Sequence, residues 1–349
     1  GGSFGFVLKS GSSLTNNASA TLGDNAVYVY GDNAGTVTSS GTAAINISGS
    51  NNVVFYTVNG GDIKNESAIT ADTETTGNIA IYNKGGSIEN KGNIIVGNSE
   101  LVYSGGTIDY ANSRYSVGVY GENSQVVNRG NINIGQDAVG LYVKDNTTAA
   151  KNYGLITAGS SSNPKNGAIG IFADGGAGIE NYGDITLYGD GVIGIAGKNA
   201  GNIVNYAVIT VTGENSTGIY GTLNTVVQNK GTINVSGDGG IGIIAPEGKI
   251  INEGTINYTN GAAAVKLQEG YAIPELINAG IINVNGHFSN EGMEISIKPN
   301  LDTLRQSDDP GVEFVLNSGS ISAGSMDITN TVSILSDFSQ GTNAKVYKM

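Results

Sequence analysis

A short motif recurs along most of the chain and constrains its fold more than any other feature. It reads apolar residue, Asn, any residue, Gly, any residue, Ile or Val. Its eleven copies begin at Asn33, Asn59, Asn90, Asn128, Asn152, Asn181, Asn205, Asn229, Asn252, Asn278 and Asn317. Between Asn128 and Asn278 successive copies lie 24, 29, 24, 24, 23 and 26 residues apart. Such a period is typical of a repeat architecture, in which each unit buries its apolar side against its neighbours.

A second motif keeps the same period. An apolar residue, Gly, another apolar residue and often an aromatic one occupy residues 117–120, 139–142, 169–172, 193–196, 217–220 and 241–244. Short runs such as 185–187, 209–211 and 233–235 alternate apolar and polar residues, which is a strand pattern. No window has the spacing of an amphipathic helix. The sequence therefore predicts an all-β chain, a parallel β-helix with three short strands in each coil of roughly 24 residues.

The spacing also predicts domain boundaries. The motif recurs to residue 285, although the interval between Asn90 and Asn128 widens to 38 residues, and we assign residues 1–285 to the β-helix. A 39-residue interval separates Asn278 from Asn317, and we assign its residues 286–310 to a large loop insertion. Residues 311–349 are expected to form terminal coils or a cap.

The repeated Asn is predicted to have a structural role. We expect Asn128, Asn152, Asn181, Asn205, Asn229, Asn252 and Asn278 to form a column at one corner of the coil. There Asn would tolerate a left-handed backbone and bond its neighbours through its amide. The Gly two residues later would supply a positive φ or a close approach of the backbone.

These motifs resemble the passenger domains of autotransporters (type V secretion), particularly the large fusobacterial outer-membrane adhesins. The resemblance covers about residues 25–349 and implies a right-handed coil, in agreement with the general rule for parallel crossovers. It also implies a protein at the cell surface, anchored in the outer membrane through a domain absent from this chain, or secreted. The chain has no cysteine, and the passenger domains that it resembles are likewise poor in cysteine.

Composition excludes several other functions. The chain has 17 basic and 30 acidic residues, a net charge of −13 and only three arginines, so nucleic-acid binding is not expected. No run of 18 apolar residues is present, so this segment is not expected to insert into a membrane. A hydrophobic share of 39% argues against disorder.

Catalytic and metal-binding residues are sparse. His287 is the only histidine and there is no cysteine, which predicts neither a catalytic triad nor a metal site, and no cofactor is expected. Because parallel β-helices also occur in carbohydrate-active enzymes, the main enzymatic alternative is carbohydrate cleavage. Hydrolysis would need a pair of carboxylates in the same or neighbouring coils. Its candidate acids are Asp174, Glu180, Asp184, Asp190, Glu214 and Asp238. Acids in Gly-Asp-Gly turns are more often turn formers, so we predict no enzyme activity.

Aromatic residues offer a better indication of binding. Tyr153, Tyr182 and Tyr206 each follow a repeat Asn and are expected to face outward in one column. Such a column would stack on sugar rings or anchor a protein partner, or it would only stabilise the sheet face. Tyr120, Tyr142, Phe172 and Tyr220 form another set in phase.

Three insertions are further binding candidates, because loops on a regular scaffold often carry function, although surface loops also tolerate added length without one. One, around residues 98–112, contains Tyr103 and Tyr110, and a shorter one covers residues 160–165. The largest lies between Asn285 and Pro310 and contains Arg305, Asp308 and Asp309.

The sequence thus favours a cell-surface adhesin segment that binds a host-cell or bacterial-surface glycan or protein through aromatic columns and loops. A carbohydrate-active enzyme on the same scaffold and an inert stalk that projects a distal binding domain are the two alternatives.

Overall fold

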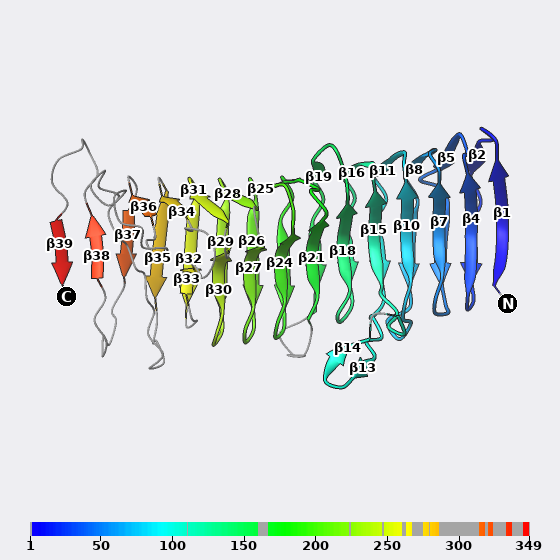
Figure 1. Cartoon of the computed structure of the whole chain (residues 1–349). Helices are drawn as coiled ribbons and strands as arrows, with labels where there is room; N and C mark the ends of the chain where they lie inside the picture. Colours follow the sequence, from blue (N-terminus) through cyan, green and yellow to red (C-terminus); the bar gives the residue numbers. More distant parts are fainter. Residues whose placement is uncertain are drawn as a thin grey trace.

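The structure is a computed structural model of the chain. It describes residues 2–109, 111–159, 167–222, 225–245 and 248–259 with their side chains. Beyond these it describes Gly280 and the backbone of strands at 263–266, 275–278, 281–285, 314–317, 320–323, 333–336 and 345–348. The described residues contain strands and no helix, and the strands stack side by side into a rod (Figure 1).

Three parallel sheets run along the rod, and the coils contribute one strand to each. Sheet A consists of β1 (Ser3–Lys9), β4 (Ala26–Asp32), β7 (Val53–Val58), β10 (Ile79–Lys84), β15 (Val117–Glu122), β18 (Val139–Lys144), β21 (Ile169–Asp174), β24 (Ile193–Lys198), β27 (Thr217–Gly221), β30 (Ile241–Ile244) and β33 (Ala263–Lys266). Sheet B consists of β2 (Leu14–Asn16), β5 (Thr36–Ser39), β8 (Asp62–Asn65), β11 (Ser87–Asn90), β16 (Gln125–Asn128), β19 (Ala150–Asn152), β22 (Ile179–Asn181), β25 (Asn202–Asn205), β28 (Val226–Asn229), β31 (Lys249–Asn252), β34 (Glu275–Asn278) and β36 (Phe314–Asn317). Sheet C consists of β3 (Ala20–Leu22), β6 (Ala44–Ile47), β9 (Ala68–Ala71), β12 (Ile94–Val96), β17 (Ile132–Ile134), β20 (Ile156–Ala158), β23 (Ile185–Tyr188), β26 (Val208–Thr212), β29 (Thr232–Ser236), β32 (Thr255–Thr259), β35 (Ile281–Asn285) and β37 (Ser320–Ala323).

Neighbours within each sheet pair in parallel and are three strands apart in the chain, except at the step over β13 and β14 and in the last pairs, β34 with β36 and β35 with β37. This arrangement confirms the predicted all-β fold, a parallel β-helix with about ten coils of roughly 24 residues and three strands per coil. Two antiparallel pairs lie outside the three sheets. They are β13 (Tyr103–Ser104) with β14 (Thr107–Ile108), and β38 (Ser333–Ser336) with β39 (Lys345–Lys348).

The core is a set of apolar columns inside the coil. In sheet C the inward positions hold Ile in nine successive coils, from Ile45 to Ile256, and each is at most 1% exposed. Sheet A contributes inward residues such as Leu141 and Ile171. Burying one such side chain is worth roughly 1.5–3 kcal/mol. Each apolar column is completed by the coils above and below, so the stability of the core depends on contacts between neighbouring coils.

The repeat Asn forms a buried column at the end of sheet B. Side-chain amides bond along the rod, from Nδ2 of one Asn to Oδ1 of the next, at 2.7–3.0 Å in seven successive steps. The steps join Asn65, Asn90, Asn128, Asn152, Asn181, Asn205, Asn229 and Asn252. The backbone of Asn278 continues the register after Asn252, and Asn317 follows it. The predicted amide stacking of the Asn column is therefore present among its described side chains.

Two details of the motif prediction are wrong. Asn65, and not Asn59, aligns with Asn90, while Asn33 and Asn59 lie in the preceding turns with φ of 49° and 57°. The described Asn residues of the column have no left-handed backbone, because they end regular strands. Of the two roles predicted for the Gly that follows, the structure shows the close approach: a Cβ at Gly154 would overlap the carbonyl oxygen of Gly130 in the preceding coil.

The predicted boundaries at 286–310 and 311–349 stay predictions. The 286–310 loop and His287 lie outside the described residues. In the last segment, β36 and β37 pair with β34 and β35, and β38 pairs with β39.

Candidate functional site

Tyr153, Tyr182 and Tyr206 are brought together as the sequence predicts, and we call them the tyrosine column. Each follows a column Asn at the corner between sheets B and C, where the chain turns outward. Their rings lie parallel, with interplanar angles of 7° and 4° and centroid separations of 4.9 and 4.6 Å. Their exposed fractions are 41%, 38% and 41%.

Two cations lie at the ends of the tyrosine column. The Arg129 guanidinium lies 4.7 Å from the centroid of Tyr153, and the Lys230 ammonium lies 5.5 Å from that of Tyr206. Both distances are within the range of a cation–π contact. Arg129 and Lys230 occupy the position after the column Asn in their own coils, so the cations and rings form one continuous row. The sequence analysis did not identify these two residues, although their position in the repeat would have indicated them.

Polar groups beside the rings hold Tyr182 in place. The Tyr182 hydroxyl donates to the Glu180 carboxylate at 3.0 Å, and the Lys151 ammonium pairs with the same carboxylate at 3.1 Å. Desolvation by the neighbouring rings, together with the hydrogen bond to Glu180, raises the pKa of Tyr182 to about 12. The hydroxyl therefore stays protonated across the physiological range.

This geometry limits what the tyrosine column can bind. Both faces of Tyr182 lie against other rings, and the outer faces of Tyr153 and Tyr206 lie under cations. A sugar ring needs an open aromatic face to stack on. The column instead offers ring edges and hydroxyl groups to solvent, so its parallel stacking favours the structural alternative for this feature.

A longer aromatic ladder lies on the outward side of sheet A. Successive centroids are 4.4–5.9 Å apart along Phe4, Tyr30, Tyr56, Tyr82, Tyr120, Tyr142 and Phe172. The sequence analysis found only its last three members, because Tyr30, Tyr56 and Tyr82 lie in strands that lack the motif Gly. Ala196 separates Phe172 from Tyr220 in the register, so Tyr220 does not continue the ladder.

The insertion between β12 and β15 projects from the rod as a β-hairpin (Figure 1). We call residues 99–115 the hairpin insertion. Tyr103 lies in its first strand and is 63% exposed, the highest fraction among the exposed large apolar side chains of the described residues. Gly105 and Gly106 form the tip with φ of 60° and 84°, as a tight hairpin turn requires.

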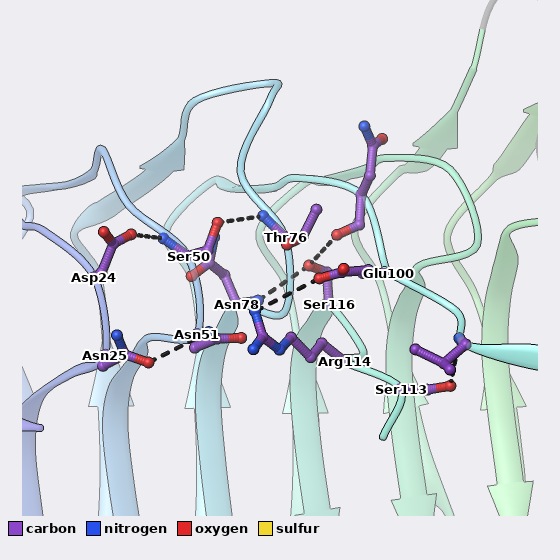
Figure 2. Close-up of polar contacts among 12 residues, drawn as sticks. Asp24, Asn25, Ser50, Asn51, Thr76, Asn78, Glu100, Ser113, Arg114 and Ser116 are labelled. Atoms are coloured by element: carbon purple, nitrogen blue, oxygen red, sulfur yellow. Dashed lines mark hydrogen bonds and ion pairs between the residues drawn. The ribbon is translucent and has the colours of Figure 1, made fainter. Parts of the chain in front are cut away.

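The base of the hairpin insertion is held by a defined set of polar contacts (Figure 2). Glu100 and Arg114 exchange two backbone hydrogen bonds of 2.8 Å, and their side chains pair at 3.5 Å. The Ser116 hydroxyl donates to the carbonyl of Asn98 at 2.8 Å and accepts from the backbone N–H of Asn78 at 3.1 Å. These contacts join the hairpin to the neighbouring coil and fix its direction.

Three of the six acids considered for catalysis, Asp184, Asp190 and Glu180, serve as turn acceptors or as an ion-pair partner. Asp184 accepts from the backbone N–H of Val208 at 3.0 Å, and Asp190 accepts from that of Glu214 at 2.9 Å, each across to the next coil. Within the described residues, no group of three His, Cys, Asp or Glu side chains is arranged to hold a metal ion.

Four predicted binding residues lie outside the described residues, namely Tyr110, Arg305, Asp308 and Asp309, and so does the insertion at residues 160–165. The structure therefore brings the three residues of the tyrosine column together. It places Tyr103 apart from that column, on the hairpin insertion.

Comparison with known families agrees with this architecture. Two family models match the chain. The BigA third pectate lyase-like domain matches residues 1–183, more than half of the 349-residue chain, and the chain therefore belongs to that family. The BigA beta sandwich domain matches residues 309–349.

Both families are of the bacterial surface adhesin or autotransporter-passenger type. No curated protein and no solved structure matches the chain. In the described part of the chain, no helix has the length and apolar character needed to cross a membrane.

Proposed function

We propose that this chain is an adhesin segment that binds a host-cell or bacterial-surface glycan or protein, and that the hairpin insertion makes the principal contact. The observation that carries the proposal is the hairpin itself, which projects from a regular rod (Figure 1) and carries Tyr103, 63% exposed, in its first strand. Exposed aromatic side chains are frequent anchors of binding interfaces. The polar contacts that fix the base of the hairpin support this role, because a fixed loop loses less conformational entropy when it binds.

The tyrosine column has a secondary part in this proposal. Its ring faces are occupied, so it would contribute edges and hydroxyl groups along a shallow contact. Its principal role is to stabilise the corner between sheets B and C. Several weak contacts along one rod add up by multivalency, which suits a surface adhesin.

Location and origin are part of the same proposal. The chain acts at the bacterial surface, either anchored in the outer membrane through a domain outside this chain or secreted. The likeness to fusobacterial adhesins in particular rests on the repeat motif alone.

The experiment measures binding of the labelled chain to epithelial and bacterial cells, with and without glycosidase treatment. Saturable binding is expected, and Tyr103→Ala should weaken it about tenfold or more. Replacing residues 97–116 by Gly-Asp-Gly-Val, the turn that joins β23 to β24, should abolish most of it. Tyr182→Ala is the matched control, with a smaller effect. Absence of saturable binding to every surface would refute the adhesin proposal and leave the stalk.

An enzyme remains the second candidate only because the matching family is described as pectate lyase-like. We propose that the chain performs no such reaction, since Asp184 and Asp190 bond the backbone of the next coil. Incubation with pectate and neutral polysaccharides, with and without calcium, tests this point. Release of unsaturated or reducing ends that scales with protein concentration would refute it.

A further inference from the structure

The outward face of sheet C differs in charge from the rest of the rod. None of its twelve strands contains a charged residue, although the chain carries a net charge of −13. The outward faces of the other sheets carry charges such as Lys84 and Glu122 on sheet A and Lys151 and Glu180 on sheet B. Two acids lie beside the strands of sheet C, Asp72 and Asp184, at its two margins.

Uncharged side chains, all of them short and polar except Ile95, occupy the middle of this face. One outward residue per coil forms a straight column, which we call the polar column. Its described members are Thr21, Asn46, Thr70, Ile95, Asn133, Thr157, Thr186, Thr210, Asn234 and Asn257. The first five are exposed and the others half-buried.

The polar side chains partly satisfy one another along the rod. Asn257 donates from Nδ2 to Oδ1 of Asn234 at 2.9 Å, and Asn234 donates to the Thr210 hydroxyl at 3.3 Å. The Ser236 hydroxyl donates to that of Thr212 at 3.2 Å in the adjacent column. A polar group that already has a partner costs less to remove from water than an unpaired one. The part of this face formed by β26, β29 and β32 can therefore be covered with a smaller desolvation penalty.

A second copy of the chain fits such a face. Parallel, in-register strands whose outward ladders are short, polar and uncharged pack face to face in dry paired sheets. The second copy also has the same axial repeat, so its side chains fall between those of the first along the whole contact. Any pairing through sheets A or B would instead bring charged columns together in two acidic molecules.

The available area is sufficient for such a pair. Ten described strands at about 4.8 Å spacing give a face about 48 Å long, and strand lengths of three to five residues at about 3.3 Å per residue give a width of about 10–16 Å. Pairing would cover about 500–750 Å² on each partner, or about 1,000–1,500 Å² in total, which reaches the size of a specific interface.

We propose that the outward face of sheet C is a self-association surface, through which two copies of this chain pair laterally as a two-fold dimer. This surface is distinct from the hairpin insertion and does not depend on the proposed adhesin function. On a cell it would pair rods of the same protein, carried on one cell or on two.

Sedimentation velocity over a concentration series tests the proposal on the intact chain. We expect a reversible monomer–dimer equilibrium. Thr186→Glu should weaken it at least about tenfold, because equivalent glutamates from both copies enter one uncharged interface. Thr38→Glu, the same change on the outward side of sheet B, should leave it unchanged. The hairpin replacement should also leave it unchanged, which separates this test from that of the adhesin proposal.

A charge-swap mixture shows that a lost dimer is not a folding defect. Thr186→Glu and Thr186→Lys chains should each associate weakly alone and should regain association when mixed. Circular dichroism checks that each variant keeps its strands. A wild-type chain that stays monomeric at every concentration, or equal weakening by Thr38→Glu, would overturn the proposal. A monomer whose binding to a neutral polysaccharide is lost in Thr186→Glu would assign the face to a glycan and overturn it as well.

Discussion

Truncating one amide in the buried Asn column is the sharpest test of how the rod is held together. Asn152 is fully buried, and its side chain makes three hydrogen bonds. Its Oδ1 accepts from Asn128 at 2.8 Å, and its Nδ2 donates to Asn181 and to the carbonyl of Gly154, both at 2.9 Å. Asn152→Ala removes all three and leaves its column neighbours each one bond short.

The expected magnitude follows from those three bonds. A net contribution of about 1 kcal/mol for each gives about 3 kcal/mol, and a buried amide left short of a partner adds more, for a total of about 3–5 kcal/mol. Because coils contact only their neighbours, the loss should be greatest in the coils of β16, β19 and β22. The ladder extends through eight described Asn side chains, so some loss should spread along it.

Native-state hydrogen exchange is the suitable assay, because a long repeat array need not unfold in one step. The opening free energy of amides in those three strands should fall by about 3–5 kcal/mol, and that of amides in β7 should change less. Asn133→Ala, at an exposed position on sheet C, is the control and should change the opening free energy by less than about 0.5 kcal/mol. A fall below about 1 kcal/mol in Asn152→Ala would refute the claim that the amide ladder stabilises the rod.

Three further predictions concern the glycines and the tyrosines. Gly154→Ala should cost about 1–3 kcal/mol in the same exchange measurement, because its Cβ overlaps the carbonyl of Gly130, whereas Gly105→Ala at the open hairpin tip should leave these coils unchanged. The free energy of unfolding should fall above pH 10. Desolvation raises the pKa of Tyr82, Tyr120 and Tyr182 in the folded chain, to about 12 for Tyr182. The unfolded chain therefore loses these tyrosine protons at a lower pH than the folded chain does. Denaturant melts between pH 7 and 11 measure this, and a flat profile would contradict it. A double-mutant cycle of Arg129→Gln and Tyr153→Leu should give a coupling of about 0.5–1 kcal/mol, and a coupling of zero would show that the cation does not interact with the ring.

Much of the fold could be predicted from the sequence because a coil repeats its own environment. An inward Ile in one coil meets the same residue type in the next, so periodicity reports packing directly. The errors arose where one short pattern has two meanings. Asn59 has a Gly two residues after it, as most Asn residues of the column do. It nevertheless lies in a turn with a left-handed backbone, and Asn65 takes the place in the column.

The candidate site was predicted less completely, for a physical reason. Register predicted that Tyr153, Tyr182 and Tyr206 would share a column, but it carried no information on ring orientation. The parallel stacking and the flanking cations decide that the ring faces are covered, and both depend on side-chain rotamers. The contacts that hold the hairpin insertion, such as Ser116 with Asn78, cross between coils and leave no periodic signal.

The sequence by itself determined the strand period, the coil length, the apolar core columns and the buried Asn column, since each is a local pattern repeated at a constant interval. Only the tertiary structure decided which aromatic faces remain open, how the hairpin is held and which sheet presents an uncharged face. Those properties depend on which strands stack into one sheet and which side chains they point outward. A chain must close into a three-sided coil before its outward residues are divided among three faces, and that division sets what each face can bind.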